Sequence, residues 1–293
     1  MTSMTPKAPK APMAVPVGRP AVTPPPVRFA DLVAAEWIKI RSLRSTSWTL
    51  ALVTLVVIGA AVAAAMADYN NFPGYSPEAQ REHPFSLHDA FPAAGYMSLM
   101  LAAGCVGAVT ATGEYGSGLI RTTTVAVPAR GAVVAAKAVV TAALWTVVGL
   151  SVAACSFAVS QAILSGRDAG ITLGHPGAVR ALVASALLAP VCALLGLGLG
   201  FLIRHSATAM VTTTFTLLML PMFFSTEKRW SAEVRNLMVD SAWQRLTMDW
   251  VPSQADSLIP LHTATLTRSW MAYGLWPTAA VALALVLVRR RDV

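Results

Sequence analysis

The sequence predicts an all-α membrane protein with six transmembrane helices, and three observations lead to this fold class. Hydrophobic residues make up 55% of the 293 residues and charged residues only 12%, about half the charged fraction of an average soluble protein. The mean hydropathy is +0.59. Six uncharged stretches each reach about 20 residues, the length at which a helix crosses the hydrocarbon core of a bilayer. A soluble fold would need a more polar surface than this chain can supply.

The six stretches divide the chain into spans and connections. The spans are expected at about residues 48–67, 93–112, 138–164, 181–203, 206–226 and 269–288, within a six-span domain over residues 47–293. Only Arg204 and His205 separate the fourth span from the fifth. These two spans are therefore expected to form a tight helical hairpin.

The distribution of Lys and Arg predicts that both termini are cytoplasmic. Fourteen of the 22 Lys and Arg residues lie in the segments on the side of the termini, and eight lie on the other side. Five of these eight fall in the long connection after span five, which the positive-inside rule weights less than short loops. No cleavable signal peptide precedes the first span. We expect a multi-pass protein of the cell (plasma) membrane.

Two different segments precede the first span. Residues 1–27 are rich in proline and almost free of large apolar residues, so they predict a disordered cytoplasmic tail, and a spacer is favoured over a proline-motif docking site. Residues 28–46 predict a basic amphipathic helix at the membrane interface. At 100° per residue one face carries Phe29, Leu32, Val33, Trp37, Ile40 and Leu43, with Lys39 and Arg41 at its edges or opposite.

Glu36 breaks this amphipathic pattern, because it lies in the middle of the apolar face. A carboxylate in that place needs a partner. Two explanations are open: an ion pair within the helix, with Lys39 or Arg28, or an ion pair with another cytoplasmic segment. We weigh the two equally.

The cytoplasmic connection between spans two and three carries a candidate docking site. Its residues Glu114, Gly118, Leu119, Ile120, Arg121 and Thr122 predict a short helix with two large apolar side chains exposed to the cytosol and a charge on either side. Such a helix has the features of a docking element for a partner protein. A helix lying flat on the bilayer would be favoured if this connection stood alone.

Three segments resemble the membrane subunits of type-2 ATP-binding-cassette transporters, the actinobacterial permeases in particular. They are the run Ala35-Glu36-Trp37-Ile38-Lys39-Ile40-Arg41-Ser42, the pattern Glu114-Tyr115-x-x-Gly118-x-Ile120-Arg121-Thr122-Thr123 through Pro128-x-Arg130, and Trp250-x-Pro252-Ser253. The likeness extends from about residue 28 to the end of the chain. The Pro-rich tail departs from the family pattern, so the role of that tail stays open.

The resemblance implies the remaining architecture and the function. It implies an interfacial N-terminal helix, a cytoplasmic coupling helix between spans two and three, and an extracellular helical hairpin between spans five and six. It also implies a dimer, formed with an identical subunit or a paralogue, and a separate cytoplasmic ATPase. The chain is accordingly expected to be the permease of an exporter embedded in the lipid bilayer, with no nucleic-acid partner.

Two further features bear on packing and on the membrane surface. Residues 227–268 alternate charges with Trp230, Trp243 and Trp250, aromatics that are typical of a membrane interface, and predict short helices broken at Pro252 and Pro260. In span four, Gly196, Gly198 and Gly200 form a small-residue face. Close packing within one subunit is favoured for this face over a dimer interface.

The sequence lacks the motifs expected for ATP hydrolysis, metal binding and catalysis. No Gly-x-x-x-x-Gly-Lys-Ser/Thr motif occurs, so ATP hydrolysis is expected in a partner. The cysteines Cys105, Cys155 and Cys192 fall inside spans without a ligand spacing, and the five histidines lie far apart. We therefore expect no catalytic residue, no metal and no cofactor. The predicted spans also lack Asp, Glu, Lys and Arg, which argues against an ion-coupled carrier.

The lack of charge in the spans bears on the substrate, which we expect to be hydrophobic or amphipathic: a lipid, a drug or an antibiotic. The direction of transport rests on the family alone. Two other classes stay open, namely a membrane-embedded enzyme and a membrane protein that binds a partner without transporting.

The predicted topology can be tested by thiol labelling in intact cells. In a variant whose three native cysteines are replaced, a cysteine at Gln80 should react with a membrane-impermeant reagent, because Gln80 lies in the expected external loop. A cysteine at Thr123 should react only after the cells are opened. Labelling of Thr123 from outside would reverse the orientation.

Overall fold

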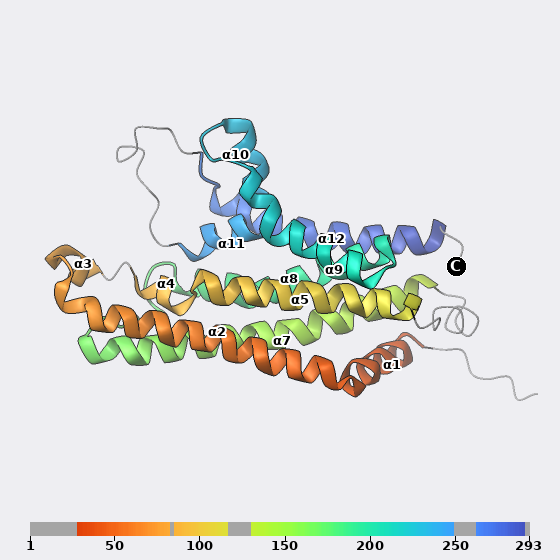
Figure 1. Cartoon of the computed structure of the whole chain (residues 1–293), viewed down its shortest axis with the longest axis horizontal. Helices are drawn as coiled ribbons and strands as arrows, with labels where there is room; N and C mark the ends of the chain where they lie inside the picture. The colour runs from red at the N-terminus through yellow and green to blue at the C-terminus, as the bar shows by residue number, and fades with distance from the viewer. Residues whose placement is uncertain (1–27, 83–84, 117–129, 249–261, 291–293) are drawn as a thin grey trace, which may run out of the picture.

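The computed structural model describes residues 28–82, 85–116, 130–248 and 262–290, and every regular element in these ranges is helical (Figure 1). Six helical segments are long and apolar enough to span a membrane: Arg44–Gly74, Ser86–Gly116, Arg130–Arg167, Ala178–Ile203, Ser206–Phe223 and Leu266–Arg290. The six predicted spans are thereby confirmed. The first three segments extend one or more turns beyond the predicted limits, because charged residues at the span ends continue the helix.

The described chain begins with α1 (Phe29–Ser42), a bend at Leu43, and the long helix α2 (Arg44–Asn71). The elements that follow are η1 (Phe72–Gly74), α3 (Pro77–Glu82), α4 (Ser86–Ala90), α5 (Ala93–Gly116), α7 (Arg130–Leu164), η2 (Ser165–Arg167), α8 (Ala178–Ile203), α9 (Ser206–Thr214), η3 (Phe215–Met219), η4 (Leu220–Phe223), α10 (Arg229–Asn236), α11 (Val239–Thr247) and α12 (Leu266–Arg290).

The short elements separate to the two ends of the helical bundle. Helix α1 lies at one end, together with the end of α5 and the end of α12, whereas α3, α4, α10 and α11 lie toward the other (Figure 1). We call these the α1 end and the α3 end. This separation is what an even number of spans requires, since both termini of the helical bundle then emerge on one side.

Helix α8 is the most deeply buried of the six spans, and glycines allow it to approach its neighbours. A Cβ atom at Gly196 would overlap the backbone carbonyl of Gly104 in α5, and one at Gly200 would lie 2.6 Å from the carbonyl oxygen of Ala108. Gly198 faces α12, where a Cβ would lie 2.7 Å from the Cβ of Ala280. All three glycines therefore serve packing within the subunit, as the sequence favoured.

The hairpin between α8 and α9 is as short as predicted. Arg204 ends α8 in the left-handed conformation, with φ of 61°. His205 then caps α9, since its ring nitrogen Nδ1 accepts a hydrogen bond from the backbone N–H of Thr208 at 3.4 Å. One residue to stop a helix and one to start the next suffice for the reversal.

Span five is shorter than the predicted 206–226. After Thr214 the helix widens into the π-helix η3 and then tightens into the 3₁₀-helix η4, which contains Pro221 and ends at Phe223. Because proline lacks an N–H, it cannot continue the hydrogen bonding of the preceding turn. The change of helix type and the proline together end this span early.

The connection after span five differs from the expectation at Trp243. Trp230 is exposed, but Trp243 lies in the core, where its indole N–H donates to Ser185 Oγ at 3.1 Å. Its ring stacks on Tyr96 with 5.2 Å between centroids. The interface placement is therefore wrong for Trp243, because α11 packs against α8 and α12. Trp250, Pro252 and Pro260 lie outside the described residues.

The close approach of α8 to α5 yields a stability prediction. Gly196→Ala should lower the free energy of unfolding by about 1–3 kcal/mol, since the added methyl group meets a backbone carbonyl that cannot move aside. Gly59→Ala in α2 is the matched control, because a Cβ there meets nothing within 4 Å. Thermal unfolding of the detergent-purified proteins measures both. Equal midpoints for Gly196→Ala and Gly59→Ala would contradict the packing described.

Candidate functional site

Four charged side chains form a closed ring at the α1 end, and we call them the ion cluster: Glu36, Lys39, Glu114 and Lys137. The ammonium nitrogen of Lys137 lies 2.6 Å from Glu36 Oε2 and 3.0 Å from Glu114 Oε1. The ammonium nitrogen of Lys39 lies 2.7 Å from Glu36 Oε1 and 2.8 Å from the same Glu114 oxygen. The ring therefore joins α1, α5 and α7.

Each member of the ion cluster is positioned by its helix. Glu36 and Lys39 stand three residues apart on α1, so their side chains lie on one face. Glu114 belongs to the last turn of α5, two residues before Gly116. Lys137 lies two turns inside α7, which begins at Arg130. The three helices meet only because α1 bends at Leu43 and packs against α7.

Three members of the ion cluster are almost fully buried, and the cluster holds equal numbers of acidic and basic groups. The side chains of Lys137 and Glu36 are 2% and 4% exposed, that of Glu114 is 11% exposed, and that of Lys39 is 42% exposed. Two carboxylates balance two ammonium groups. A lone charge in such a place would be strongly destabilising, whereas a satisfied ring removes most of that cost.

Lys39 is the most exposed member, and its ionisation is controlled by the carboxylates. Burial alone would lower the pKa of Lys39, but hydrogen bonds to Glu114 and Glu36, together with their charges, raise this pKa above its ordinary value. Lys39 is therefore protonated at neutral pH. Its contribution to stability is present below its ordinary pKa and is lost only as the pH rises through the raised value.

The ion cluster shows that both explanations for Glu36 hold, since Glu36 forms an ion pair within its own helix and another with a different helix. Glu36 contacts Lys39 within α1 and also Lys137 in α7. The partner in α7 was not anticipated, because the sequence placed Lys137 just outside the third span. A single lysine between Ala136 and Ala138 in an apolar run was the available indication.

The other predicted site residues divide into two groups. Trp37 and Arg41 are exposed on α1 and take no part in the ion pairs of the cluster. The helix itself covers Phe29–Ser42 rather than 28–46. Of the expected coupling residues, Glu114 joins the ion cluster. Gly118, Leu119, Ile120, Arg121 and Thr122 lie outside the described residues, as does the tail 1–27.

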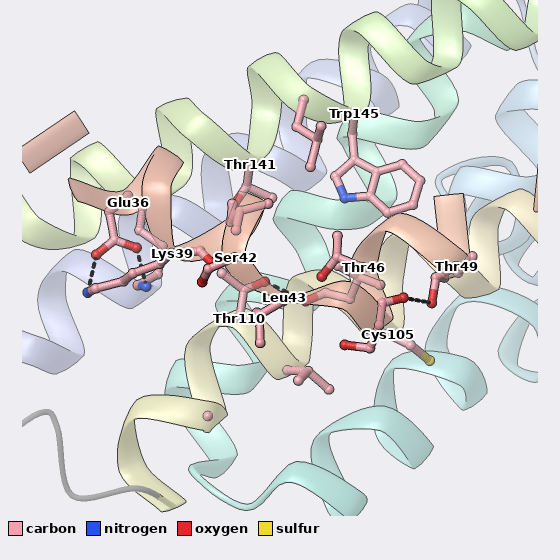
Figure 2. A pocket seen from close by; sticks show the side chains of 18 of the residues that line it. Glu36, Lys39, Ser42, Leu43, Thr46, Thr49, Cys105, Thr110, Thr141 and Trp145 are labelled. Atoms are coloured by element: carbon pink, nitrogen blue, oxygen red, sulfur yellow. Dashed lines mark hydrogen bonds and ion pairs between the residues drawn. The ribbon is translucent and has the colours of Figure 1, made fainter. Parts of the chain in front are cut away.

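A cavity of about 600 Å³ adjoins the ion cluster (Figure 2). All four cluster residues line it, with Glu36 and Lys39 at one end in Figure 2, and Trp145 of α7 and Cys105 of α5 line it farther along. Its remaining wall comes from the start of α2 and from Met210 of α9. The cavity thus begins at the charged ring and continues along the helices of the bundle.

Ionisable groups also lie at the α3 end, at the opposite ends of the same spans. The hydroxyl of Tyr75 donates to Asp68 Oδ1 at 2.7 Å, and this hydrogen bond raises the pKa of Tyr75. Asp89 is 2% exposed, and its Oδ2 accepts no hydrogen bond. Asp89, Glu114 and Lys137 lie outside the predicted uncharged spans 93–112 and 138–164, near the ends of the longer helical segments that the structure shows.

The described residues contain no group of three or more His, Cys, Asp or Glu side chains that could hold a metal ion. Cys105, Cys155 and Cys192 are all free thiols. No protein-family model and no curated protein matches this chain. The geometry of the ion cluster and of the cavity is therefore the main basis for a functional proposal.

The burial of the ion cluster predicts that removing one of its charges lowers the free energy of unfolding much more than removing an exposed charge. Lys137→Met should lower the free energy of unfolding by about 3–5 kcal/mol, because it leaves two buried carboxylates with one shared cation. Arg229→Met is the matched control, since Arg229 pairs with Glu233 at 3.3 Å with both side chains exposed, and an exposed pair contributes at most about 1 kcal/mol. Thermal unfolding in detergent distinguishes the two variants.

A second variant separates loss of charge balance from loss of packing. Glu36→Gln combined with Lys137→Met removes one charge of each sign and should recover part of the stability lost in Lys137→Met alone. Strictly additive losses in this pair would show that the four groups do not act as one ring.

Proposed function

We propose that this chain is the transmembrane permease subunit of a type-2 ATP-binding-cassette exporter. It forms the translocation pathway as a dimer, with an identical subunit or a paralogue, and is driven by a separate cytoplasmic ATPase. The substrate is hydrophobic or amphipathic: a lipid, a drug or an antibiotic. The six-span helical architecture and the resemblance of residues 35–42 and 114–130 support this proposal.

The observation that carries the proposal is the ion cluster. A transporter driven from outside the membrane needs a rigid connection between the ATPase dock and the helices that line the pathway. Glu114 and Lys137 lie near the two helix ends, Gly116 and Arg130, that precede and follow the proposed docking segment 118–124 in the chain. The cluster fastens both ends to α1. A displacement of the docking segment would therefore move α1, α5 and α7 together.

The orientation of the chain in the membrane follows from the same proposal. With the ATPase in the cytoplasm, the α1 end faces the cytoplasm and the α3 end faces outward, in agreement with the excess of Lys and Arg in the segments at the α1 end. The amphipathic helix α1 then lies at the inner membrane surface. Its exposed side chains include Trp37 and Ile38, which suit the headgroup region.

An ion-coupled carrier is the second candidate, because the chain holds a buried acidic side chain near one end of a membrane-spanning segment. Asp89 is buried at the start of the second membrane-spanning segment, next to the carboxyl group of Asp68, and buried acidic groups of this kind occur in proton relays. The two candidates differ in their energy source. Transport that proceeds without any ATPase and depends on Asp89 would favour the carrier.

The docking prediction is tested by co-purification. The chain is co-expressed with the cytoplasmic ATPase that the proposal requires, and the complex is isolated in detergent through a tag on the permease. Leu119→Asp should abolish co-purification, because it places an unpaired charge in a small interface whose apolar anchors each contribute about 2 kcal/mol or more. Arg121→Ala should weaken binding less, or uncouple ATP hydrolysis from transport.

The matched control is Leu173→Asp. Leu173 is also an exposed leucine in a connection, but it lies between η2 and α8 at the α3 end, so the same change should leave co-purification intact. Both variants should insert into the membrane at wild-type levels. If the Leu119→Asp variant co-purifies the ATPase at wild-type yield and activity, the assignment of the docking segment is wrong. The proposal of a transporter subunit then loses much of its support.

A further inference from the structure

The cavity beside the ion cluster has the size and the opening of a ligand site. Its volume of about 600 Å³ lies within the range of about 300–1,000 Å³ that is typical of small-molecule pockets. Val109 and Gly113, which line it on α5, are exposed. The cavity is therefore open along the side of α5, on the lateral surface of the helical bundle.

The lining changes in character along the cavity. The ion cluster forms the end nearest α1. Hydroxyl groups come next, among them Thr46 of α2 and Thr141 of α7. Along α5 the lining farther from Glu114 is apolar, with Val106 and Ala102, and Met210 of α9 also lines the cavity. A molecule that matches this wall has a polar head, a less polar middle and an apolar tail.

Two hydrogen-bond donors in the cavity wall have no partner. Trp145 Nε1 and Thr141 Oγ1 are both buried, and neither makes a hydrogen bond; the two residues are 0% and 2% exposed. A buried donor without an acceptor costs about 1–3 kcal/mol. In Figure 2 the indole nitrogen of Trp145 lies on the edge of the ring turned toward Thr141 and Thr46.

Thr141 is unusual among the threonines of these helices. Thr110, Thr112 and Thr146 each donate to the backbone carbonyl four residues earlier, at distances of 2.7–3.1 Å. This local bond is the ordinary way to satisfy a threonine in an apolar helix. Thr141 makes no such bond, so its buried hydroxyl is left without a hydrogen-bond partner among the described residues.

The spacing of these donors fits one class of ligand. Thr141 lies four residues after Lys137 and Trp145 four residues further, so the donors lie about 6 and 12 Å along α7 from the charged ring. All three share one face of the helix. A matching ligand thus carries a hydrogen-bond acceptor between a polar head and an apolar tail. A glycerophospholipid has this order, with its phosphate first, then its ester carbonyl and then its acyl chain.

We propose that this cavity binds one anionic phospholipid of the bilayer. An ester carbonyl accepts hydrogen bonds from Trp145 and Thr141, and an acyl chain lies along the apolar wall of α5, α7 and α9. The phosphate lies at the bend between α1 and α2, where Lys39 lines the cavity and supplies positive charge, with Arg41 and Arg44 close to it in the chain. Water in the cavity would satisfy the two donors, but it would make no favourable contact with the apolar wall. This inference does not rest on the transport function.

The experiment measures lipid retention by native mass spectrometry. The full chain is purified from nanodiscs that contain equal amounts of phosphatidylglycerol and phosphatidylcholine, transferred to mild detergent, and analysed for bound lipid. We expect one phosphatidylglycerol per wild-type subunit. The double variant Trp145→Phe/Thr141→Val should retain about tenfold less, because both donors are removed while the shapes are nearly kept.

The matched control is Trp48→Phe/Thr146→Val, which makes the same two changes outside the cavity. Trp48 is exposed on α2, and Thr146 is the neighbour of Trp145 on α7 with its hydroxyl bonded to Ala142. Retention equal to that of wild type is expected. Equal retention by the cavity variant and the control, or no preference for phosphatidylglycerol, would overturn the proposal.

A second measurement uses the wild-type chain and its own thiols. Cys105 lines the cavity and is partly exposed, whereas Cys155 is exposed outside it. Added phosphatidylglycerol should slow the reaction of Cys105 with N-ethylmaleimide several-fold and leave Cys155 unchanged, as read by peptide mass spectrometry. Protection of Cys105 that follows dimer formation and is independent of lipid would assign the cavity to a second copy of the chain and overturn the proposal.

Discussion

The structure depends on one requirement: a charged side chain that is buried away from water needs a group of opposite charge beside it. Lys137 has no access to solvent, so two carboxylates must reach it, and these come from helices separated by long stretches of sequence. Meeting that requirement brings the last turn of α5 against α7 and draws α1 back onto both. The bend at Leu43 follows, because α1 could not otherwise leave the axis of α2 and reach the ring.

A second constraint acts on the middle of the bundle, where no charge is available to hold helices together. There α5, α7 and α8 approach through glycines whose missing side chains admit a neighbouring backbone, such as Gly107 against Ala193 and Gly149 against Ala186. Association in an apolar medium rests on such close packing, since the solvent is as apolar as the side chains. Helices α2 and α9 are much less buried than α8, and the cavity lies between α2 and the tightly packed helices.

The two constraints together explain why a polar cavity exists at the α1 end. The ion cluster holds α1 across the ends of α5 and α7, and the start of α2 follows α1, so the wall of α2 stands away from α5 along the hydroxyl-bearing turns. Close packing resumes deeper in the bundle, at Val53 and Val57, which are buried. One arrangement of four charged side chains thus underlies both proposals. It forms one end of the proposed ligand site, and it joins the helices next to the proposed docking segment.

The sequence by itself determined the number of spans, their approximate limits, the tight α8–α9 turn and the small-residue packing face, because each depends on local composition and helix periodicity. It also identified Glu36 as a residue in need of a partner, since a carboxylate on an apolar face is unfavourable wherever the helix packs. The tertiary structure alone decided that Lys137 is this partner, that Trp243 belongs to the core, and that Trp145 and Thr141 face a cavity. These three facts depend on which helices meet, and contacts between residues far apart in the chain leave no trace in the local pattern.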